Sequence, residues 1–396
     1  MPALSFTDAR STVLREVRAH RVLPAAEIVY IEACEGRVLA EDIPADRDYP
    51  AFNRSARDGF AVRSKDIPGR VRIIGEVRAG ERFSGSIETG ETVEIMTGAP
   101  VPEGADAVLM VEYAARHADG FVETDRAEPA GTNIAPAACE ARSGSVVLPQ
   151  GTRIGYTSVA WIATTGHTRV SVYRRPKVAI IATGDEIVGI AETPATHQIR
   201  NSNAYSLAAQ VRRAGGDPLI LPVAKDSKEA TRELIRQGLD ADMLLLSGGV
   251  SAGKYDFVES ALAECGAHFF FDRVLIQPGQ PVVFGSAQGK FFFGLPGNPA
   301  STTVTFEVFA RAALDLLSGM NEAPLPLTLA RLSEPFRHKP GLTRILPAYV
   351  SCSQVTPVPW HGSGDIPSLC RANAFLVADA SQADYAAGDL IPVLLK

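Results

Sequence analysis

The sequence predicts a multidomain protein of the α/β plus β class, built around an open, mostly parallel α/β sheet domain. Strands and helices alternate from residue 177 to about residue 320, which is the pattern of a parallel sheet covered by helices. Residues 43–145 contain short alternating runs between Gly and Pro turns, which is typical of a β-rich domain. A chain of 396 residues also exceeds what one hydrophobic core usually serves. We therefore expect two to four domains.

The elements before the sheet domain follow from apolar spacing and turn residues. Apolar residues recur at helical intervals over residues 5–21, with arginines on the other face. A helix is likewise expected over residues 157–164 and a strand over residues 170–173. The proline and the charges of residues 174–177 then mark a linker.

The sheet domain begins with the continuous apolar run 178–182, as expected of a strand buried on both faces. Asn298 and Pro299 open its last helix as N-cap and first helical residue, and that helix is expected to reach residue 317. From residue 324 onwards the pattern is β-like, with no expected helix. Between these limits we expect helices over 203–214, 227–238 and 256–265, and strands over 219–223, 243–246, 269–276, 282–284 and 291–293.

Composition and charge argue against several classes of function. The formal net charge is -6 and no Lys/Arg tract occurs, so we expect no nucleic-acid partner and no binding to membrane surfaces. The apolar runs are too short to cross a bilayer, and residues 1–10 carry no targeting signal. The 5 Cys form no CxxC pair and have no His at ligand spacing, which indicates reduced thiols and a cytoplasmic location.

Acidic residues follow three successive strands of the predicted sheet. Glu186 comes after the first strand, Asp226 after the second and Asp256 after the third. The carboxyl ends of parallel strands meet at one edge, where ligands bind. Carboxylates gathered there suit Mg²⁺ held beside a substrate phosphate. Each acid could also be a turn residue or a helix cap, Asp256 above all.

Two glycine-containing loops of the sheet domain are candidate anion sites. Residues 247–253 form a strand-to-helix loop whose glycines let the backbone approach an anion closely. Residues 248–254 also match the GxxxxGK phosphate loop, but Tyr255 follows where that motif needs Ser or Thr, so we reject a nucleotide hydrolase. Residues 294–301 form a tight turn before a helix N-terminus, which attracts oxyanions, although an ordinary capped helix explains the pattern equally well.

These segments together resemble the molybdopterin molybdenumtransferase family, which includes the C-terminal domain of gephyrin. Residues 50–61 look like the family's PPFDNSAMDGYA, and residues 97–106 match its TGAPxPxGAD. The matches run in the family's order over nearly the whole chain. They continue with TGDEL at residues 183–187, GQIxxSN near residues 199–203, SGGVSxGxxD at 247–256, GLPGNPxS at 294–301, and a QGSG and AN pair near 362–364 and 372–373.

The resemblance implies an elongated homodimer whose cleft lies between a β-rich lid domain of one subunit and the α/β domain of the other. It implies insertion of molybdenum from molybdate into adenylylated molybdopterin, with Mg²⁺-dependent release of AMP. The adenylyltransferase that makes this substrate and apo-molybdoenzymes are implied partners. The implied domains are a helical linker domain (1–44 plus 146–176), the lid (45–145), an α/β molybdopterin-binding domain (177–322) and a C-terminal β domain (323–396).

The resemblance also implies roles for individual residues. Glu186, Asp226 and Asp256 are candidates for Mg²⁺ binding and catalysis, and Asp58 and Thr97 match positions in the cleft from the lid, although their loops alone read as structural turns. A lid would keep water from the reactive dithiolene. The implied substrate-binding residues are Ser247, Gly248, Gly249, Ser251 and Gly253 for the phosphate or pterin, and Pro296, Gly297, Asn298 and Ser301 for the oxyanion.

The chain departs from the family where the family is basic. Gln277 and Gln280 replace both lysines of the usual KPGKP, and the stretch from Ala135 to Ala137 lacks the arginines of NIRxxGED. Each loss removes charge assistance of about 1–2 kcal/mol. Arg54 and Arg57 could restore positive charge from the lid. A divergent paralogue with weak or tungstate-directed insertion, and a gephyrin-like scaffold, are therefore the alternatives.

Overall fold

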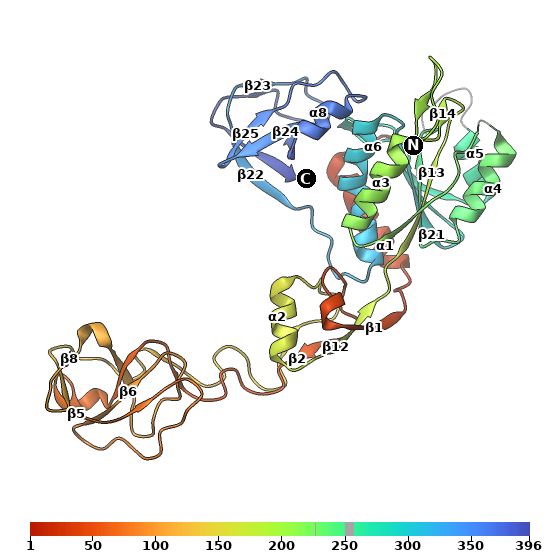
Figure 1. Cartoon of the computed structure of the whole chain (residues 1–396). Coiled ribbons are helices and arrows are strands. Elements are labelled where there is room, and N and C mark those ends of the chain that lie inside the picture. The colour runs from red at the N-terminus through yellow and green to blue at the C-terminus, as the bar shows by residue number, and fades with distance from the viewer. Residues whose placement is uncertain (226, 250–256) are drawn as a thin grey trace. The chain divides into compact units, whose positions relative to one another are not determined.

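The computed structural model describes residues 1–225, 227–249 and 257–396 (Figure 1). The chain divides into two compact units, each with a hydrophobic core of its own. The first, called here the sheet unit, comprises Met1–Ala40, Gly151–Gly155 and Val170–Lys396. The second, called here the β unit, comprises Glu41–Gln150 and Tyr156–Arg169.

The sheet unit is built on a six-stranded α/β sheet. The first four strands in spatial order pair in parallel, and the last two pair antiparallel. This confirms the expected open and mostly parallel sheet. The strands in spatial order are β16 (Asp217–Ile220), β13 (Lys177–Ala182), β17 (Met243–Ser247), β21 (Lys290–Leu295), β20 (Val283–Ala287) and β18 (His268–Phe271).

Helices cover both faces of this sheet, as Figure 1 shows for α3 and α4. Val178 and Ile180 of β13 pack into the core on one face, and Ala179 and Ile181 pack into the core on the other. The strand is thus buried on both faces, as its apolar run predicted. The first face is covered by α1 (Phe6–His20), α3 (Ser202–Arg213), α6 (Pro299–Thr305) and α7 (Arg311–Leu317), and the second by α4 (Lys228–Gly238) and α5 (Phe257–Glu264).

The strand order reverses between β13 and β17. From β13 the chain passes through α3 to β16 on one side, and then through α4 to β17 on the other side of β13. The loops beyond the carboxyl ends of β13 and β17 therefore leave the sheet in different directions. Open α/β sheets bind ligands in the crevice that forms at such a point.

Helices α1, α4 and α6 begin at polar N-cap residues. The Ser5 and Ser227 hydroxyls accept hydrogen bonds from Asp8 N at 3.1 Å and Ala230 N at 3.4 Å. Asn298 is the N-cap of α6, although its side chain makes no capping bond. The helix expected to reach residue 317 is divided by a π-helical turn, Phe306–Ala310. Among the described residues, no helix is long and apolar enough to cross a lipid bilayer.

The C-terminal part of the sheet unit is a second six-stranded sheet, closed by the pairing of β24 with β26. The expectation of no helix here was wrong, because α8 (Ile366–Arg371) begins at Asp365, whose carboxylate accepts a hydrogen bond from Ser368 N at 3.0 Å. So short a helix has no apolar periodicity to reveal it. The strands are β19 (Ile276–Gln277), β22 (Leu327–Leu332), β24 (Thr343–Ser351), β25 (Gln354–Pro357), β26 (Ala374–Ala378) and β28 (Leu390–Leu395), with β23 (Phe336–Arg337) and β27 (Asp384–Tyr385) paired separately.

The β unit contains a third six-stranded sheet, with separate cores on its two faces. Phe60 and Leu109 belong to one core, and Ala61 and Val108 to the other. Its strands in spatial order are β7 (Ala107–Met110), β4 (Gly59–Val62), β6 (Glu91–Ile95), β5 (Gly69–Val77), β9 (Phe121–Thr124) and β8 (Ala115–Arg116). Short pairs join β2 (Ile43–Pro44) with β11 (Val146–Leu148) and β3 (Arg54–Ser55) with β10 (Ile134–Ala135), and the helix is α2 (Tyr156–Thr164).

Two further short pairs complete the sheet unit. β1 (Ala26–Tyr30) pairs with β12 (Arg169–Tyr173), which starts at the last residue of the β unit. β14 (Ile187–Val188) pairs in parallel with β15 (Ile199–Arg200), directly after the loop that follows β13. The second pair fixes the backbone of the segment that carries Glu186, because Ile199 N donates to Glu186 O at 2.9 Å.

Replacement of a buried aromatic ring in the sheet is expected to lower stability strongly. Phe293 is fully buried, and its ring centroid lies 4.7 Å from that of Phe284. Phe293→Ala should lower the free energy of unfolding by about 3–5 kcal/mol, because it leaves a cavity. Leu219→Ala, on edge strand β16 with 49% exposure, is the control and should change it far less. Equal losses in denaturant titrations of both variants would contradict this packing.

Candidate functional site

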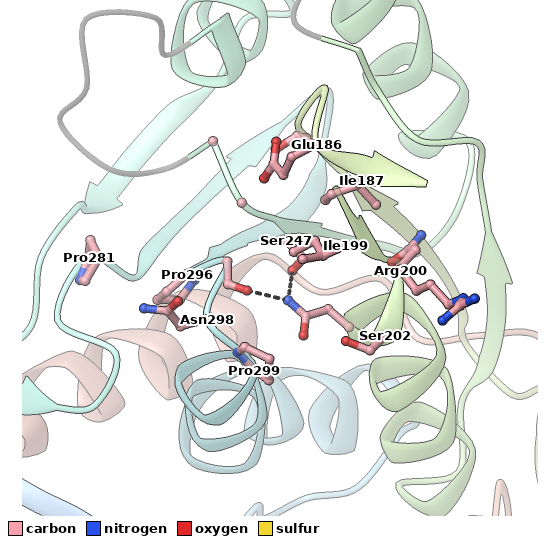
Figure 2. A pocket seen from close by; sticks show the side chains of 16 residues that line it. Glu186, Ile187, Ile199, Arg200, Ser202, Ser247, Pro281, Pro296, Asn298 and Pro299 are labelled. Carbon is pink, nitrogen blue, oxygen red and sulfur yellow. Dashed lines mark hydrogen bonds between the residues drawn. The ribbon is translucent and has the colours of Figure 1, made fainter. Parts of the chain in front are cut away.

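A pocket of about 390 Å³ lies beyond the carboxyl ends of β13 and β17, at the point where the strand order reverses. Figure 2 shows how its lining side chains gather around one hollow. The segments that follow β13, β17 and β21 all contribute to it. It is lined by Thr183, Glu186, Ile187, Ile199, Arg200, Asn201, Ser202, Asn203, Ser247, Gly248, Gly249, Pro281, Pro296, Gly297, Asn298 and Pro299.

The loop after β17 requires glycine at its first two positions. Gly248 has φ 93 and Gly249 has φ 63, which side chains rarely adopt. A Cβ at Gly248 would lie 2.8 Å from Thr183 O, and a Cβ at Gly249 would lie 2.8 Å from Thr183 Oγ1. Thr183 and the two glycines therefore occupy space that no other residue type could share. The packing of this loop against Thr183 therefore requires both glycines, and close approach of its backbone to a ligand stays a prediction.

The Asn203 side chain connects the two predicted anion loops. Its Nδ2 donates to Ser247 Oγ at 2.9 Å and to Gly297 O at 2.7 Å, and Figure 2 shows both bonds as dashed lines. Asn203 lies in the first turn of α3, whose N-cap Asn201 accepts from Ala204 N at 3.2 Å. The helix start thus holds the loops after β17 and β21 together.

The Glu186 carboxylate is exposed at the pocket. Gly184, with φ 136, has no Cβ, and a Cβ there would overlap this carboxylate. Among the lining residues that the structure describes, the only other charged one is Arg200, whose Nε donates to Glu192 O at 3.0 Å. The described part of the pocket is therefore formed mainly by neutral polar groups and backbone.

The structure describes only one of the three predicted metal ligands, Glu186. Asp226 and Asp256, together with Ser251 and Gly253, lie outside the described residues. Within the described ranges no three His, Cys, Asp or Glu side chains could hold one metal ion. Ala224, two positions before Asp226, forms a parallel bridge with Thr183, and Gly184 N donates to its carbonyl at 3.1 Å. The chain thus reaches the end of β13 shortly before Asp226, and the set of three carboxylates stays a prediction.

The start of α6 offers fewer free donors than the sequence indicated. Pro299 has no N–H, and Ala300 N donates to Ser363 O at 2.9 Å, from the loop before α8. Ser301 is 4% exposed and lies outside the lining of the pocket. Pro296, Gly297 and Asn298 line the pocket as expected. The oxyanion role of this turn stays a prediction.

Asp58 and Thr97 contact each other within the β unit. The carboxylate Oδ1 of Asp58 accepts from Thr97 N at 2.6 Å and from Thr97 Oγ1 at 2.7 Å. These bonds, the backbone one first, lower the pKa of Asp58 below its usual value. Both residues are exposed. Asp58 is therefore an ionised acceptor at neutral pH, held in place by the loop that follows β6.

The neutral replacements of the family's basic residues are placed as follows. Gln277 and Gln280 are exposed, and Pro281 at the end of the same segment lines the pocket. Ala135 belongs to β10, which pairs with β3. Arg54 forms an ion pair with Glu140 inside the β unit. The suggestion that Arg54 and Arg57 restore a missing charge stays a prediction.

The sequence reasoning assigned no role to Thr183, Arg200, Asn201 or Asn203, all of which line the pocket. Thr183 and Asn203 belong to stretches that resemble the family, but neither carries charge or obvious acid–base chemistry. Their position becomes evident only when β13, α3 and β17 are brought together. The signal that could have indicated a role for Thr183 is its place in the sequence, three positions before Glu186.

A side chain at Gly248 is expected to disrupt the pocket floor. Gly248→Ala adds a Cβ in contact with backbone at a left-handed φ, whereas Gly289→Ala adds one at φ 75 with nothing within 4 Å. Both variants should lose roughly 1–2 kcal/mol of unfolding free energy for the backbone conformation. Gly248→Ala should lose about 1–3 kcal/mol more for overpacking, as measured by denaturant unfolding. Identical losses would mean that the loop relaxes freely.

Removal of the Thr97 hydroxyl is expected to raise the pKa of Asp58. Thr97→Val deletes one of the two donors but keeps the backbone N–H, so the pKa should move part of the way toward its usual value of about 3.9. Thr97→Ser is the control and should leave it depressed. Because the folded pKa is lowered, the stabilisation is present above about pH 4 and is lost as the pH falls through the folded pKa. NMR titration of the carboxyl carbon measures this, and an unchanged pKa in Thr97→Val would contradict it.

Comparison with known proteins agrees with the motifs. Family models described as MoeA N-terminal region (domain I and II), probable molybdopterin binding domain, and MoeA C-terminal region (domain IV) match residues 4–166, 179–316 and 329–396. A molybdopterin molybdenumtransferase of Bacillus subtilis (strain 168) is 35% identical over 385 residues, covering 93% of this chain and 89% of the relative. One of Nostoc sp. is 32% identical over 411 residues, covering 99% and 94%.

Solved structures give the same result. The crystal structure of a molybdopterin biosynthesis moeA protein from Pyrococcus horikoshii OT3 superimposes with a TM-score of 0.79. It is 27% identical and covers 100% of both chains. The resemblance first drawn from short motifs is thus confirmed across the whole chain, in sequence and in fold. The chain belongs to the molybdopterin molybdenumtransferase family.

Proposed function

We propose that this protein inserts molybdenum from molybdate into adenylylated molybdopterin and releases AMP. The observation that carries the proposal is the pocket at the switch point of the parallel sheet, where two glycine-containing loops meet one exposed carboxylate. Such a site suits a diphosphate, because backbone N–H groups and hydroxyls can approach its oxygens without crowding. Family membership supplies the identity of the substrate.

The sheet unit would bind the substrate mainly through neutral donors. Ser247, Gly248 and Gly249 would hold a phosphate or the pterin, and Pro296 to Asn298 would line the oxyanion position. Gln277 and Gln280 can donate hydrogen bonds but lack charge, so anion affinity should be lower by about 1–2 kcal/mol for each absent lysine. Binding by this chain would therefore depend on the placement of its donors more than on charge.

Mg²⁺ suits the donor chemistry of the pocket. Glu186 presents a carboxylate there, and carboxylate oxygens are the side-chain ligands that Mg²⁺ prefers. Glu186, Asp226 and Asp256 would hold the ion, which would neutralise the diphosphate and polarise the bond to be broken. Ser251 and Gly253 would complete the loop around the phosphate. Of these three proposed Mg²⁺ ligands, Glu186 is the one that lies among the described residues.

The β unit would contribute a preformed acceptor. Asp58 is ionised and fixed by two bonds from Thr97, so its carboxylate could receive a hydrogen bond without reorganisation. This role requires the β unit to reach the substrate, as the family resemblance implies for a lid. The same proposal includes a homodimer located in the cytoplasm. It divides the chain into domains after residues 44, 145, 176 and 322. It also includes the adenylyltransferase and apo-molybdoenzymes as partners.

The proposal is tested by AMP release. Purified protein given adenylylated molybdopterin, molybdate and Mg²⁺ should release AMP and form active cofactor. Glu186→Gln keeps the shape but removes the charge, so it should need at least about tenfold more Mg²⁺ for half-maximal rate. Glu229→Gln, exposed on α4 and outside the pocket lining, is the matched control.

The competing outcomes are distinct. A folded wild-type protein that releases no AMP would contradict the proposed function and favour a paralogue that only binds. An unchanged Mg²⁺ requirement in Glu186→Gln would remove Glu186 from the metal set while leaving the reaction intact. Faster turnover with tungstate than with molybdate would instead identify a different oxyanion substrate.

A further inference from the structure

The orientation of the Asn203 amide is determined by its neighbours. The group that faces Gly297 O at 2.7 Å must be the NH₂, because a carbonyl oxygen only accepts hydrogen bonds. The same nitrogen lies 2.9 Å from Ser247 Oγ. An amide nitrogen has two hydrogens and no lone pair available to accept. One hydrogen is therefore directed to each of these oxygens.

In this orientation the Ser247 hydroxyl hydrogen has no hydrogen-bond acceptor among the described residues. Ser247 Oγ accepts from Asn203, so its own hydrogen must point away from Asn203. Within residues 1–225, 227–249 and 257–396, Ser247 Oγ makes no other hydrogen bond. Ser247 is 1% exposed, and a buried hydroxyl normally has a partner. Ser247 lines the pocket, so an acceptor bound in the pocket could receive this hydrogen.

Thr183 presents a second hydroxyl of the same kind. It is 7% exposed, lines the pocket, and its Oγ1 has no hydrogen-bond partner in the part of the chain that the structure describes. Thr183 and Ser247 lie at the ends of adjacent strands, and Thr183 N donates to Ser247 O at 3.0 Å. The floor of the pocket thus contains two buried hydroxyls with unassigned hydrogens.

We propose that Asn203 is a positioning residue that turns the Ser247 hydroxyl hydrogen into the pocket, where it and Thr183 donate to phosphate oxygens of the substrate. Neutral, oriented donors fit a chain in which Gln277 and Gln280, just before the lining residue Pro281, stand where the family has lysines. The inference rests on the proposed function for the identity of the ligand. It adds Thr183 as a new binding group, makes Ser247 an oriented donor, and adds Asn203 as a residue that acts through Ser247.

A double-mutant cycle tests how Asn203 acts. Ser247→Ala and Asn203→Ala should each raise the Kd for AMP about five- to tenfold, since each loses one productive hydrogen bond. The double variant should be no more than about twofold worse than the weaker-binding single variant, because both changes remove the same donor. In the AMP-release assay the singles should raise KM for adenylylated molybdopterin while kcat changes little. Thr183→Val should raise the Kd for AMP on its own. In the double variant with Ser247→Ala, the two fold increases in Kd should multiply.

Asn201→Ala is the matched control for an effect on the helix start. Asn201 caps the same turn of α3, but it makes no bond to Ser247. In the double variant, the fold increases in Kd from Asn201→Ala and Ser247→Ala should multiply. They should not give the effect of a single variant alone. If the effects of Asn203→Ala and Ser247→Ala also multiply, Asn203 does not act through Ser247 and the proposal is overturned. The same holds if Asn203→Ala changes melting temperature but not Kd.

Failure of the proposed function gives a different result. A wild-type protein that binds AMP in calorimetry but does not turn over loses the proposed reaction, while the cycle in Kd still decides the role of Asn203. If the protein turns over but binds AMP too weakly for calorimetry, the same double-mutant cycle is measured as KM for adenylylated molybdopterin. A protein that neither binds AMP nor turns over contradicts both proposals.

Discussion

The parallel pairing of β13 with β16 on one side and β17 on the other is the constraint on which the site depends. Its register places Ala182 opposite Ser247, so both strands end at the same level. Thr183 and Gly248 then follow in adjacent positions, and a Cβ at Gly248 would collide with Thr183. The hydrophobic cores on both faces hold this register, because a shift of one residue would exchange the side chains of the two faces.

The described lining of the resulting pocket carries little positive charge for a proposed anion site. Arg200 is the one cationic residue among the described lining residues, and its guanidinium donates to a carbonyl of the neighbouring loop. Other arginines are engaged elsewhere: Arg153 pairs with Asp315, and Arg174 pairs with Asp242. Affinity would come from preorganised donors, whose cost in conformational entropy is met when the chain folds.

The two units contribute in different ways to this proposal. In the sheet unit, the lining comes from loops fixed by strand pairing and by Asn203, together with the turn that Ser363 O holds at Ala300 N. In the β unit, Asp58 and Thr97 form a local pair that needs no other element. Such local rigidity would let an acceptor keep its ionised form whatever the surrounding conformation.

The sequence by itself determined the class of fold, most helix positions, the family and the loops that line the pocket, because periodicity and short motifs are local signals. It could not reveal α8, which is too short for a pattern, nor the loss of the Ala300 N–H to Ser363. Only the tertiary structure brought Thr183, Asn203 and Ser247 together. Their interaction depends on strand order and on one amide that spans two loops, and neither has a signature along the chain.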